Sequence, residues 1–300
     1  MKYSKLTKEN FLKTSKDYIS LTKPKVILLL VVTAISGMFL ANGSTPSIIL
    51  MLVIILGGTL ASGGAGAINH FIDKDVDQMM KRTSNRPVAS SRVSPKNALS
   101  FGIILTLLSF IVLYFGSNLL TAILAISGNI FYVFIYSLWL KKTTSHNIVI
   151  GGIAGCFPPL VGWAAVTGTL SLPAWYLFAI IFFWTPPHFW ALAMLMDEDY
   201  KEANIPMLPT IVGFQKTQIM ILTHTIILIS LTLILTIVSS NLGLIYLSGT
   251  IILGALYMNL TIRLMKNYST KRNLGLYKFS LLYLFLLCFL IIIDSSNLVG

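Results

Sequence analysis

The sequence predicts an all-α fold: a polytopic membrane helix bundle of nine transmembrane helices around a central cavity. Of its 300 residues 55% are hydrophobic and only 11% charged, with a mean hydropathy of +0.81, which exceeds what a water-soluble domain of this length needs. Apolar stretches long enough to cross roughly 30 Å of hydrocarbon as helices recur along the whole chain. These stretches are continuous and do not alternate polar with apolar residues, so helices are expected in place of barrel strands.

The apolar stretches divide the chain into a tail and one membrane domain. Residues 1–25 are polar and Lys-rich, without Arg or an apolar run before a cleavage site, which favours a cytoplasmic tail and a bacterial plasma membrane over mitochondrial import. Residues 26–300 are expected to form a single nine-helix domain. We expect the spans, in order, at residues 26–42, 47–68, 98–115, 119–139, 147–166, 172–194, 218–239, 243–263 and 277–293.

The net charge of +12 invites a comparison with nucleic-acid-binding proteins, but its placement indicates membrane topology. In the nine-span arrangement all 22 Lys and Arg residues fall on one side of the bilayer. This positive-inside pattern predicts a cytoplasmic N-terminus and a C-terminus on the opposite side. The basic residues are therefore expected to meet anionic membrane lipid, and no nucleic acid is expected as a partner. Cys156 and Cys288 lie inside spans and indicate neither a disulfide framework nor a metal site.

A cluster of acidic residues follows the second span, where a positive-inside bias does not predict acids. Asn69, Asp73 and Asp77 are spaced four apart, which places them on one stripe of a helix continuing out of the span; Asp75 points away from that stripe. Carboxylate and amide oxygens one turn apart are suited to Mg²⁺, which takes its remaining ligands from water and phosphate. The alternative is a solvated helix with i,i+4 ion pairs worth a few tenths of a kcal/mol each.

Basic residues follow these acids within the next turns. Lys81 continues the stripe, and Arg82 and Arg86 come shortly after it. Such cations can neutralise the charge that develops on a departing diphosphate, and Arg can bind two of its oxygens at once. We assign these three residues to the catalytic set.

A second acidic cluster follows the sixth span, at the same place in the next four-helix unit. This placement indicates an internal duplication in which the two acidic loops face each other across the mouth of the cavity. Asp199 is the favoured metal ligand, together with Asp197, although Asp197 and Lys201 could equally form a plain i,i+4 surface ion pair. Tyr200 and Lys201 are assigned to substrate binding.

Two proline pairs, at residues 158–159 and 186–187, interrupt hydrogen bonding inside spans, and broken helices at membrane depth usually line a cavity. His188 lies beside the second pair between Trp184 and Trp190. An ionisable group inside the membrane is a functional candidate, so these three residues are expected to contact the acceptor substrate. The alternative is a structural His bonded to a backbone carbonyl freed by the prolines.

At these residues the chain resembles the intramembrane aromatic prenyltransferase (UbiA-type) superfamily. The first hallmark of that family, Asn-x-x-x-Asp-x-x-x-Asp, falls on Asn69, Asp73 and Asp77. The resemblance spans about residues 18–293 and is most specific to the heme-farnesylating subgroup. It is carried by residues 21–26, 157–163, 184–193, 205–209 and 277–280.

The resemblance implies a reaction and its partners. Mg²⁺ bridges farnesyl diphosphate to the two acidic loops, diphosphate departs, and a vinyl group of heme B (protoheme IX) attacks the allylic cation. Addition of water then completes heme O, so heme is a substrate and Mg²⁺ the cofactor. Heme A synthase or oxidase-assembly proteins are implied as partners in heme–copper oxidase biogenesis, and the propionates of heme are expected to meet Lys141, Lys142, Arg263 or Lys266.

Some alternatives stay open. The second hallmark of the family is often two Asp four apart, whereas Ala203 stands four residues after Asp199, so the choice among Asp197, Glu198 and Asp199 is unresolved. The acceptor could be an aromatic quinone precursor such as 4-hydroxybenzoate. A secondary transporter would also show repeats and broken helices, but its charged residues belong near the bilayer midplane, and here the acids lie at the rim.

Overall fold

The computed structural model describes residues 13–296, and within them every regular element is a helix, without strands. Nine helices of this part are long and apolar enough to cross a membrane, as predicted. The spans are α2 (Pro24–Asn42), α3 (Ile48–Ile72), α5 (Pro95–Gly116), the composite segments Leu119–Thr143 and Asn147–Thr167, α10 (Leu172–Leu195), α12 (Leu208–Val238), α13 (Leu244–Lys266) and α14 (Thr270–Ser295). Two short helices, α4 (Lys74–Met79) and α11 (Asp197–Glu202), lie between spans.

Two spans begin earlier than their apolar stretches predicted. α12 begins at Leu208, ten residues before the expected 218, because Pro209 suits a first helical turn; Gly213, with φ 77°, then kinks the helix. α14 begins at Thr270 because the Ser269 side chain accepts a hydrogen bond from the Arg272 N–H and caps the helix. Polar residues at a helix end therefore extend it beyond the segment that hydropathy detects.

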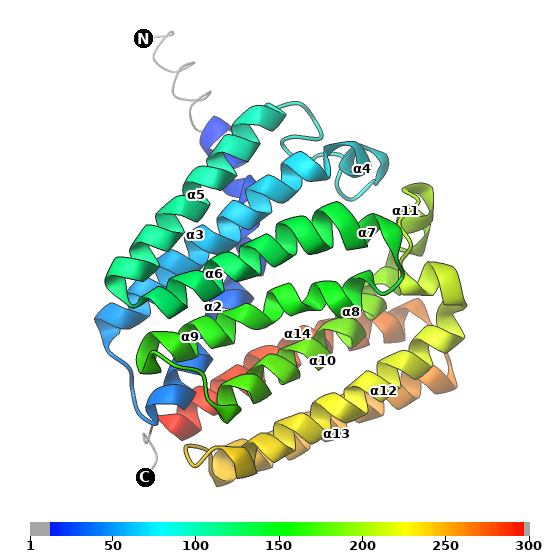
Figure 1. The fold of residues 1–300 in the computed structure, drawn as a ribbon. Helices are drawn as coiled ribbons and strands as arrows, with labels where there is room; N and C mark the ends of the chain where they lie inside the picture. Colours follow the sequence, from blue (N-terminus) through cyan, green and yellow to red (C-terminus); the bar gives the residue numbers. More distant parts are fainter. Residues whose placement is uncertain (1–12, 297–300) are drawn as a thin grey trace, which may run out of the picture.

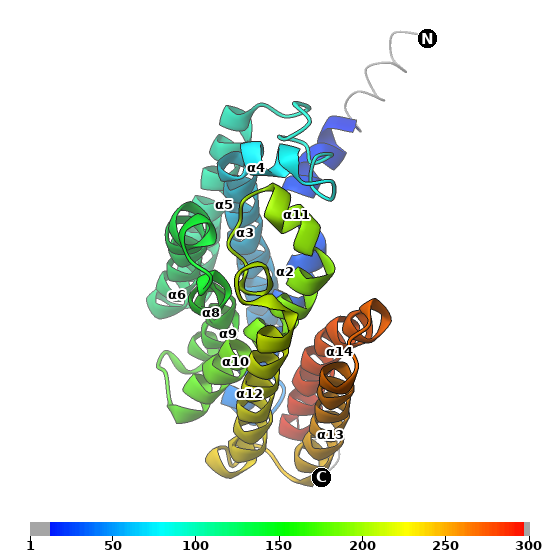
Figure 2. The ribbon, with the colours of Figure 1, turned by 90° about the vertical axis from the view of Figure 1, so that its right-hand side faces the viewer.

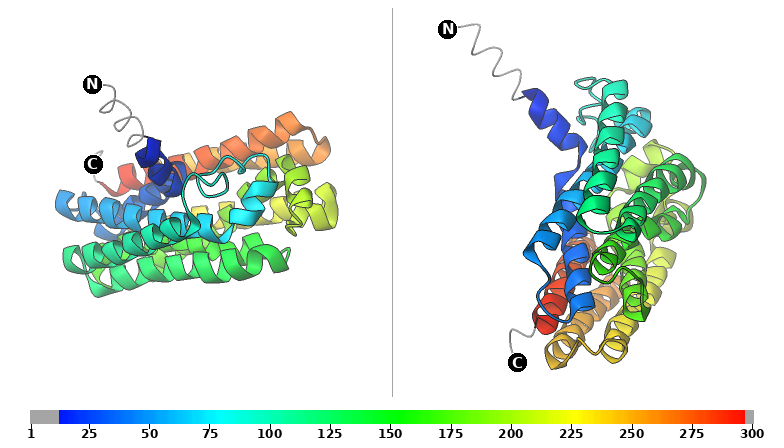
Figure 3. Two further views of the ribbon diagram at one scale, coloured as in Figure 1. Left: turned by 90° about the horizontal axis from the view of Figure 1, so that it is seen from above. Right: turned by 60° about the vertical axis from the view of Figure 1, so that its left-hand side comes forward.

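The long helices run alongside one another, and the polar ends of several gather at one end of the bundle. In Figure 1, α4, α7 (Lys141–Thr143) and α11 lie at the same end, whereas the C-terminal end of α14 lies at the other. Figure 2, from the side, shows α4 beside α11. The left view of Figure 3 shows the same bundle from above, and the right view shows it with the left-hand side of Figure 1 brought forward. The predicted placement of both acidic loops at one end is thus observed.

The fourth and fifth spans are each assembled from several helix types. The fourth passes from α6 (Leu119–Ile130) through a π-helical turn segment, η1 (Phe131–Leu140), into α7. The fifth passes from α8 (Asn147–Gly151) through a 3₁₀ segment, η2 (Gly152–Cys156), into α9 (Phe157–Thr167). The first proline pair starts α9, so the predicted break in this span is confirmed. By contrast, α10 continues as one helix through Pro186 and Pro187.

Close helix contact fixes the position of α2, which starts next to the acidic loop. α2 packs along α9, where Gly162 lies so near the Ala34 carbonyl that a Cβ would collide with it. Gly37 makes the reciprocal approach to the Pro159 carbonyl. Small residues that let backbones touch are the usual solution for helix packing in membranes, where lipid tails are as apolar as the side chains.

Candidate active site

The residues of the first acidic cluster lie where α3 passes into α4. The Asp73 N–H donates to the Asn69 carbonyl at 2.9 Å, and the Asp77 N–H to the Asp73 carbonyl at 2.7 Å, so the helical path continues across the junction. Asn69, Asp73 and Asp77 are 2%, 1% and 2% exposed, whereas Asp75 is exposed. The stripe is therefore confirmed as a buried polar surface, and the alternative of a solvated helix does not describe it.

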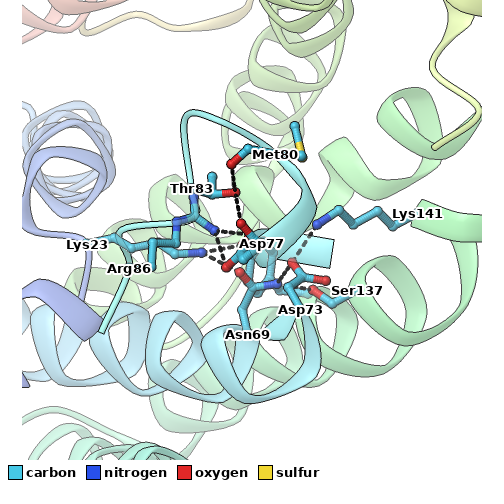
Figure 4. Close-up of polar contacts among 10 residues, drawn as sticks. Lys23, Asn69, Asp73, Asp77, Met80, Thr83, Arg86, Ser137 and Lys141 are labelled. Atoms are coloured by element: carbon cyan, nitrogen blue, oxygen red, sulfur yellow. Dashed lines mark hydrogen bonds and ion pairs between the residues drawn. The ribbon is translucent and has the colours of Figure 1, made fainter. Parts of the chain in front are cut away.

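Protein cations reach these acids from two sides, as Figure 4 shows. Lys141 forms an ion pair with Asp73 Oδ2, and Arg86 places one nitrogen 2.8 Å from both carboxylate oxygens of Asp77. Lys23 donates to Asn69 Oδ1. The amide nitrogen of the same side chain, Asn69 Nδ2, donates to Asp73 Oδ2 at 2.8 Å, so both polar atoms of the Asn69 amide have partners. The predicted role of Arg86 beside the acids thus has direct geometric support.

The other two predicted cations lie further out. Because α4 ends at Met79, Lys81 leaves the stripe and is exposed in a turn, so the expectation that it continues the stripe is wrong. Arg82 is exposed as well, but its guanidinium interacts electrostatically with the Tyr200 hydroxyl of the second acidic loop. Burial raises the pKa of Tyr200, and the charge of Arg82 opposes that rise.

The π-helix η1 supplies residues that sequence reasoning missed. Ser137 accepts from Asn69 Nδ2 at 3.0 Å, and Tyr132 lies 3.4 Å from Lys23 Nζ through its hydroxyl. Lys141 follows directly after η1 and reaches Asp73. π-Helical segments are rare and often occur at functional sites. Lys141 is therefore engaged at the acids in this structure, and its predicted contact with a heme propionate stays a prediction.

Lys23 was also missed, because a lysine before an apolar span is explained by topology alone. It adopts φ 57°, ψ 58° directly before Pro24, a left-handed conformation that non-glycine residues rarely take. Such local strain persists where surrounding contacts enforce it. Burial, and after it the charge of Arg86, lowers the pKa of Lys23 to about 7, while Asp73 acts in the opposite direction.

The second acidic cluster lies on α11. Asp197 forms an i,i+4 ion pair with Lys201 at 2.7 Å, and the Lys201 side chain is 60% exposed. The pair therefore matches the alternative that the sequence left open, a plain surface ion pair. Asp199 is half-buried and Glu198 exposed. A hollow of about 360 Å³ lies against this helix, lined by Met194, Leu195, Met196, Asp197, Glu198, Asp199 and Phe214.

An apolar cluster joins the two acidic loops. Met80 at the end of α4 packs with Tyr200 of α11 and with Ile205 and Met207 that follow it. This contact agrees with the side-by-side position of α4 and α11 in Figure 2. Tyr200 is thus buried between the loops, whereas Lys201 points outward.

The oxygen donors suit a hard cation, although residues 13–296 contain no group of three or more His, Cys, Asp or Glu gathered as metal ligands. Oδ1 of Asp73 and Oδ1 of Asp197 are buried and have no hydrogen-bond partner in the described part of the chain. Buried carboxylate oxygens normally have partners, so each of these two atoms is suited to a cation. The chemistry of the first cluster therefore fits Mg²⁺ shared with phosphate oxygens.

His188 lies in an aromatic stack. Its ring stacks on Trp184 at 4.6 Å and on Tyr277 at 5.0 Å between centroids. Nδ1 lies 2.7 Å from the Ser280 hydroxyl, which itself donates to the Tyr277 carbonyl. The hydroxyl hydrogen is used in that second bond, so Nδ1 must carry the proton and Nε2 keeps its lone pair. The alternative of a His bonded to a freed backbone carbonyl is wrong.

Trp190 lies apart from this stack. It is fully buried, and its ring meets the edge of His224 on α12 at 4.9 Å. His224 bonds the Met220 carbonyl at 2.9 Å, as expected for a structural His. Phe189, between Trp190 and His188 in sequence, packs against the Met80–Tyr200 cluster and contacts the His188 ring at 5.2 Å. The acceptor candidates are thereby connected to the acidic loops through Phe189.

Comparison with known proteins places this geometry in a family. The family model described as "UbiA prenyltransferase family" matches residues 30–289. The chain is 48% identical over 283 residues to "Protoheme IX farnesyltransferase" of Thermus thermophilus, covering 94% of this chain and 46% of that protein. It is 48% identical over 287 residues to the protein of the same name from Trichodesmium erythraeum, covering 95% and 88%. The chain therefore spans about half the length of the first relative and most of the second.

Solved structures share the fold at lower identity. A digeranylgeranylglyceryl phosphate synthase superposes with a TM-score of 0.78 at 20% identity, covering 95% of this chain and all of that one. A UbiA homolog from Archaeoglobus fulgidus bound to GPP and Mg²⁺ gives a TM-score of 0.67 at 16% identity, covering 92% and 99%. These likenesses show the arrangement of the helices.

Proposed function

The chain belongs to the UbiA prenyltransferase family, and we propose that it transfers the farnesyl group of farnesyl diphosphate to a vinyl group of heme B. Addition of water completes the product, heme O, and diphosphate is released. The observation that carries the proposal is the buried set Asn69, Asp73 and Asp77 beside three cations. The name shared by its relatives supports heme as the acceptor.

We assign binding of the donor's diphosphate to the two acidic loops. Asn69, Asp73 and Asp77 would hold Mg²⁺, with Asp197 and Asp199 contributing from the facing loop. Bound there, the metal would neutralise negative charge on the departing diphosphate. The orphaned oxygens of Asp73 and Asp197 support this assignment, as does the Mg²⁺ bound by the homolog from Archaeoglobus fulgidus.

The cations around the acids assist the leaving group. Arg86, Lys141 and Lys23 can each turn donors toward diphosphate oxygens, and Arg82 extends this positive surface toward Tyr200. Such groups act most strongly when water is excluded, and the buried position of the acids supports that condition. Departure of diphosphate leaves an allylic cation, which the heme vinyl group attacks.

The acceptor end belongs to the aromatic stack. Trp184 and Tyr277 hold the His188 ring between them, and His188 Nε2 retains a lone pair that can bind iron or hold a water. Trp190, which packs on His224 apart from this stack, stays a prediction as an acceptor contact. Ser280 fixes the His188 tautomer, which is the usual task of a residue that hydrogen-bonds a metal-binding imidazole.

Membrane topology completes the proposal. The helices and the bacterial relatives support a multi-pass membrane protein; we place its N-terminus in the cytoplasm and its C-terminus on the opposite side of a bacterial plasma membrane. Heme O formed there would serve heme–copper oxidases, with heme A synthase or oxidase-assembly proteins as partners. A secondary transporter is disfavoured, because the buried acids lie at one end of the bundle.

An acceptor competition tests the proposal. Membranes containing the chain receive radiolabelled farnesyl diphosphate, Mg²⁺, heme B and 4-hydroxybenzoate together, and the extracted products are separated by chromatography. We expect label in a heme fraction and none in the aromatic acid. Label in 4-hydroxybenzoate alone would assign the chain to quinone precursors.

A further inference from the structure

Each candidate metal ligand of the first cluster already has a protein cation as its partner. Lys141 forms an ion pair with Asp73, and Arg86 forms one with Asp77. Lys23 donates a hydrogen bond to Asn69. Only Oδ1 of Asp73 is left without a partner among the polar atoms of these three side chains in the described structure. A metal ion that took the carboxylates would displace amino and guanidinium groups from them.

The charges do not favour a metal ion arriving alone. Two carboxylates face Lys141 and Arg86 here, with Lys23 beside them on Asn69, so both negative charges are already matched before any ligand enters. Like charges interact strongly in a poorly hydrated site, at about 4 kcal/mol for unit charges 4 Å apart with an effective dielectric of about 20. A diphosphate that bound alone and drew these side chains to its own oxygens would leave both carboxylates unneutralised.

We propose that Lys141, Arg86 and Lys23 act as place-holders for the metal ion, so that divalent cation and diphosphate bind as a pair. When the pair enters, the cation takes the carboxylate oxygens and the three side chains pass to diphosphate oxygens. Binding of either partner then strengthens binding of the other by the same factor. This inference rests on the proposed function only for the use of a metal and a diphosphate.

Lys141 is the residue whose position controls this exchange. The Lys141 side chain is 14% exposed, and its amino group and Asn69 Nδ2 both contact the same atom, Asp73 Oδ2. Asn69 Nδ2 also donates to the Ser137 hydroxyl. The π-helix η1 carries Ser137 and ends directly before Lys141, so neighbouring turns of one span supply both contacts. Lys142, the next residue, is exposed and serves as a matched control.

The test measures Mn²⁺ binding to the purified chain in lipid nanodiscs, with free Mn²⁺ read from its paramagnetic resonance signal. Without diphosphate, we expect Lys141→Gln to bind Mn²⁺ at least tenfold more tightly than the wild type, because the competing cation is gone. Lys142→Gln and Lys141→Arg should bind as weakly as the wild type. Equal affinity in the wild type and Lys141→Gln, or weaker binding in the variant, would overturn the proposal.

A second measurement keeps the test decisive if Lys141→Gln does not fold. Retention of radiolabelled inorganic diphosphate by wild-type nanodiscs should rise at least tenfold when Mn²⁺ is added, and a ratio near one contradicts paired binding. Neither measurement uses heme or a farnesyl group. Coupled binding without heme O production would leave this inference standing and refute the acceptor, whereas heme O production without coupling would refute this inference alone.

Discussion

At the scale of single residues, burial separates the acid that we propose to be functional from another acid on the same short helix. Asp77 is buried and forms an ion pair with Arg86, whereas Asp75, two residues away, is exposed. Acids were detectable in the sequence because positive-inside bias predicts basic residues and leaves acidic clusters unexplained. That same bias hid Lys23, since a lysine at a span end already has a topological explanation, and Lys141 was considered only as a partner of the heme propionates.

Asp77→Asn should lower diphosphate release from farnesyl diphosphate by at least about 100-fold, because removal of one strong charge-stabilising group typically costs that much. Asp75→Asn is the matched control and should retain wild-type rates. The rates are measured by coupled diphosphate detection in membranes containing equal amounts of each variant. Equal losses in both variants would mean that α4 contributes only general negative charge.

Ser280→Ala should weaken heme binding by about tenfold, in the range observed when the hydrogen-bond partner of a ligating imidazole is removed. The reason is that His188 then loses the group that fixes its tautomer and ring orientation. Heme titration followed by absorbance gives the affinity. Ser230→Ala is the control, because Ser230 is exposed and bonds only its own helix at Ile226; unchanged heme affinity in Ser280→Ala would remove His188 from the acceptor site.

At the scale of helices, hydropathy predicted all nine spans but not their internal form. The π-helix η1 consists of apolar and aromatic residues that read as an ordinary span, so its wider turn leaves no signal in the sequence. The first proline pair predicted a real break, which became η2 and the start of α9. The second pair, Pro186 and Pro187, did not break α10, which continues through both residues. Hydropathy and proline position alone do not reveal how neighbouring helices support α10.

Gly162→Ala should destabilise the bundle by about 1–3 kcal/mol or more, the usual cost of overpacking. A Cβ at this position would lie against the backbone of α2 at Ala34, which cannot move without shifting Lys23 at the start of that helix. Gly58→Ala is the matched control, because nothing lies within 4 Å of its Cβ position. Thermal unfolding in detergent compares the two; equal melting temperatures would contradict the close packing of α2 and α9.

At the scale of the whole molecule, loop charges predict one orientation in the membrane, and the structure places both acidic loops at one end of the bundle. The loop after α2 lies at the end of the bundle opposite α4, because α2 and α3 run in opposite directions between them. The sequence predicted this arrangement from loop charges alone. The central cavity stays a prediction, since the hollow against α11 lies at one end of the bundle.

Cysteine labelling tests the orientation. In intact cells, Ser44→Cys in the loop between α2 and α3 should react with a membrane-impermeant thiol reagent. Asn85→Cys in the loop before α5 should react only after the membrane is permeabilised. The native Cys156 and Cys288 are buried and give a low background. The reverse pattern would invert the topology.

The central claim is that this buried acidic site farnesylates heme. Mass spectrometry of hemes extracted from membranes supplied with heme B, farnesyl diphosphate and Mg²⁺ tests it directly, with Asp73→Ala beside the wild type. We predict a heme heavier by one farnesyl group and one water in the wild type and unchanged heme B in the variant. Unchanged heme B in both, with the wild type shown to be folded, would contradict the account.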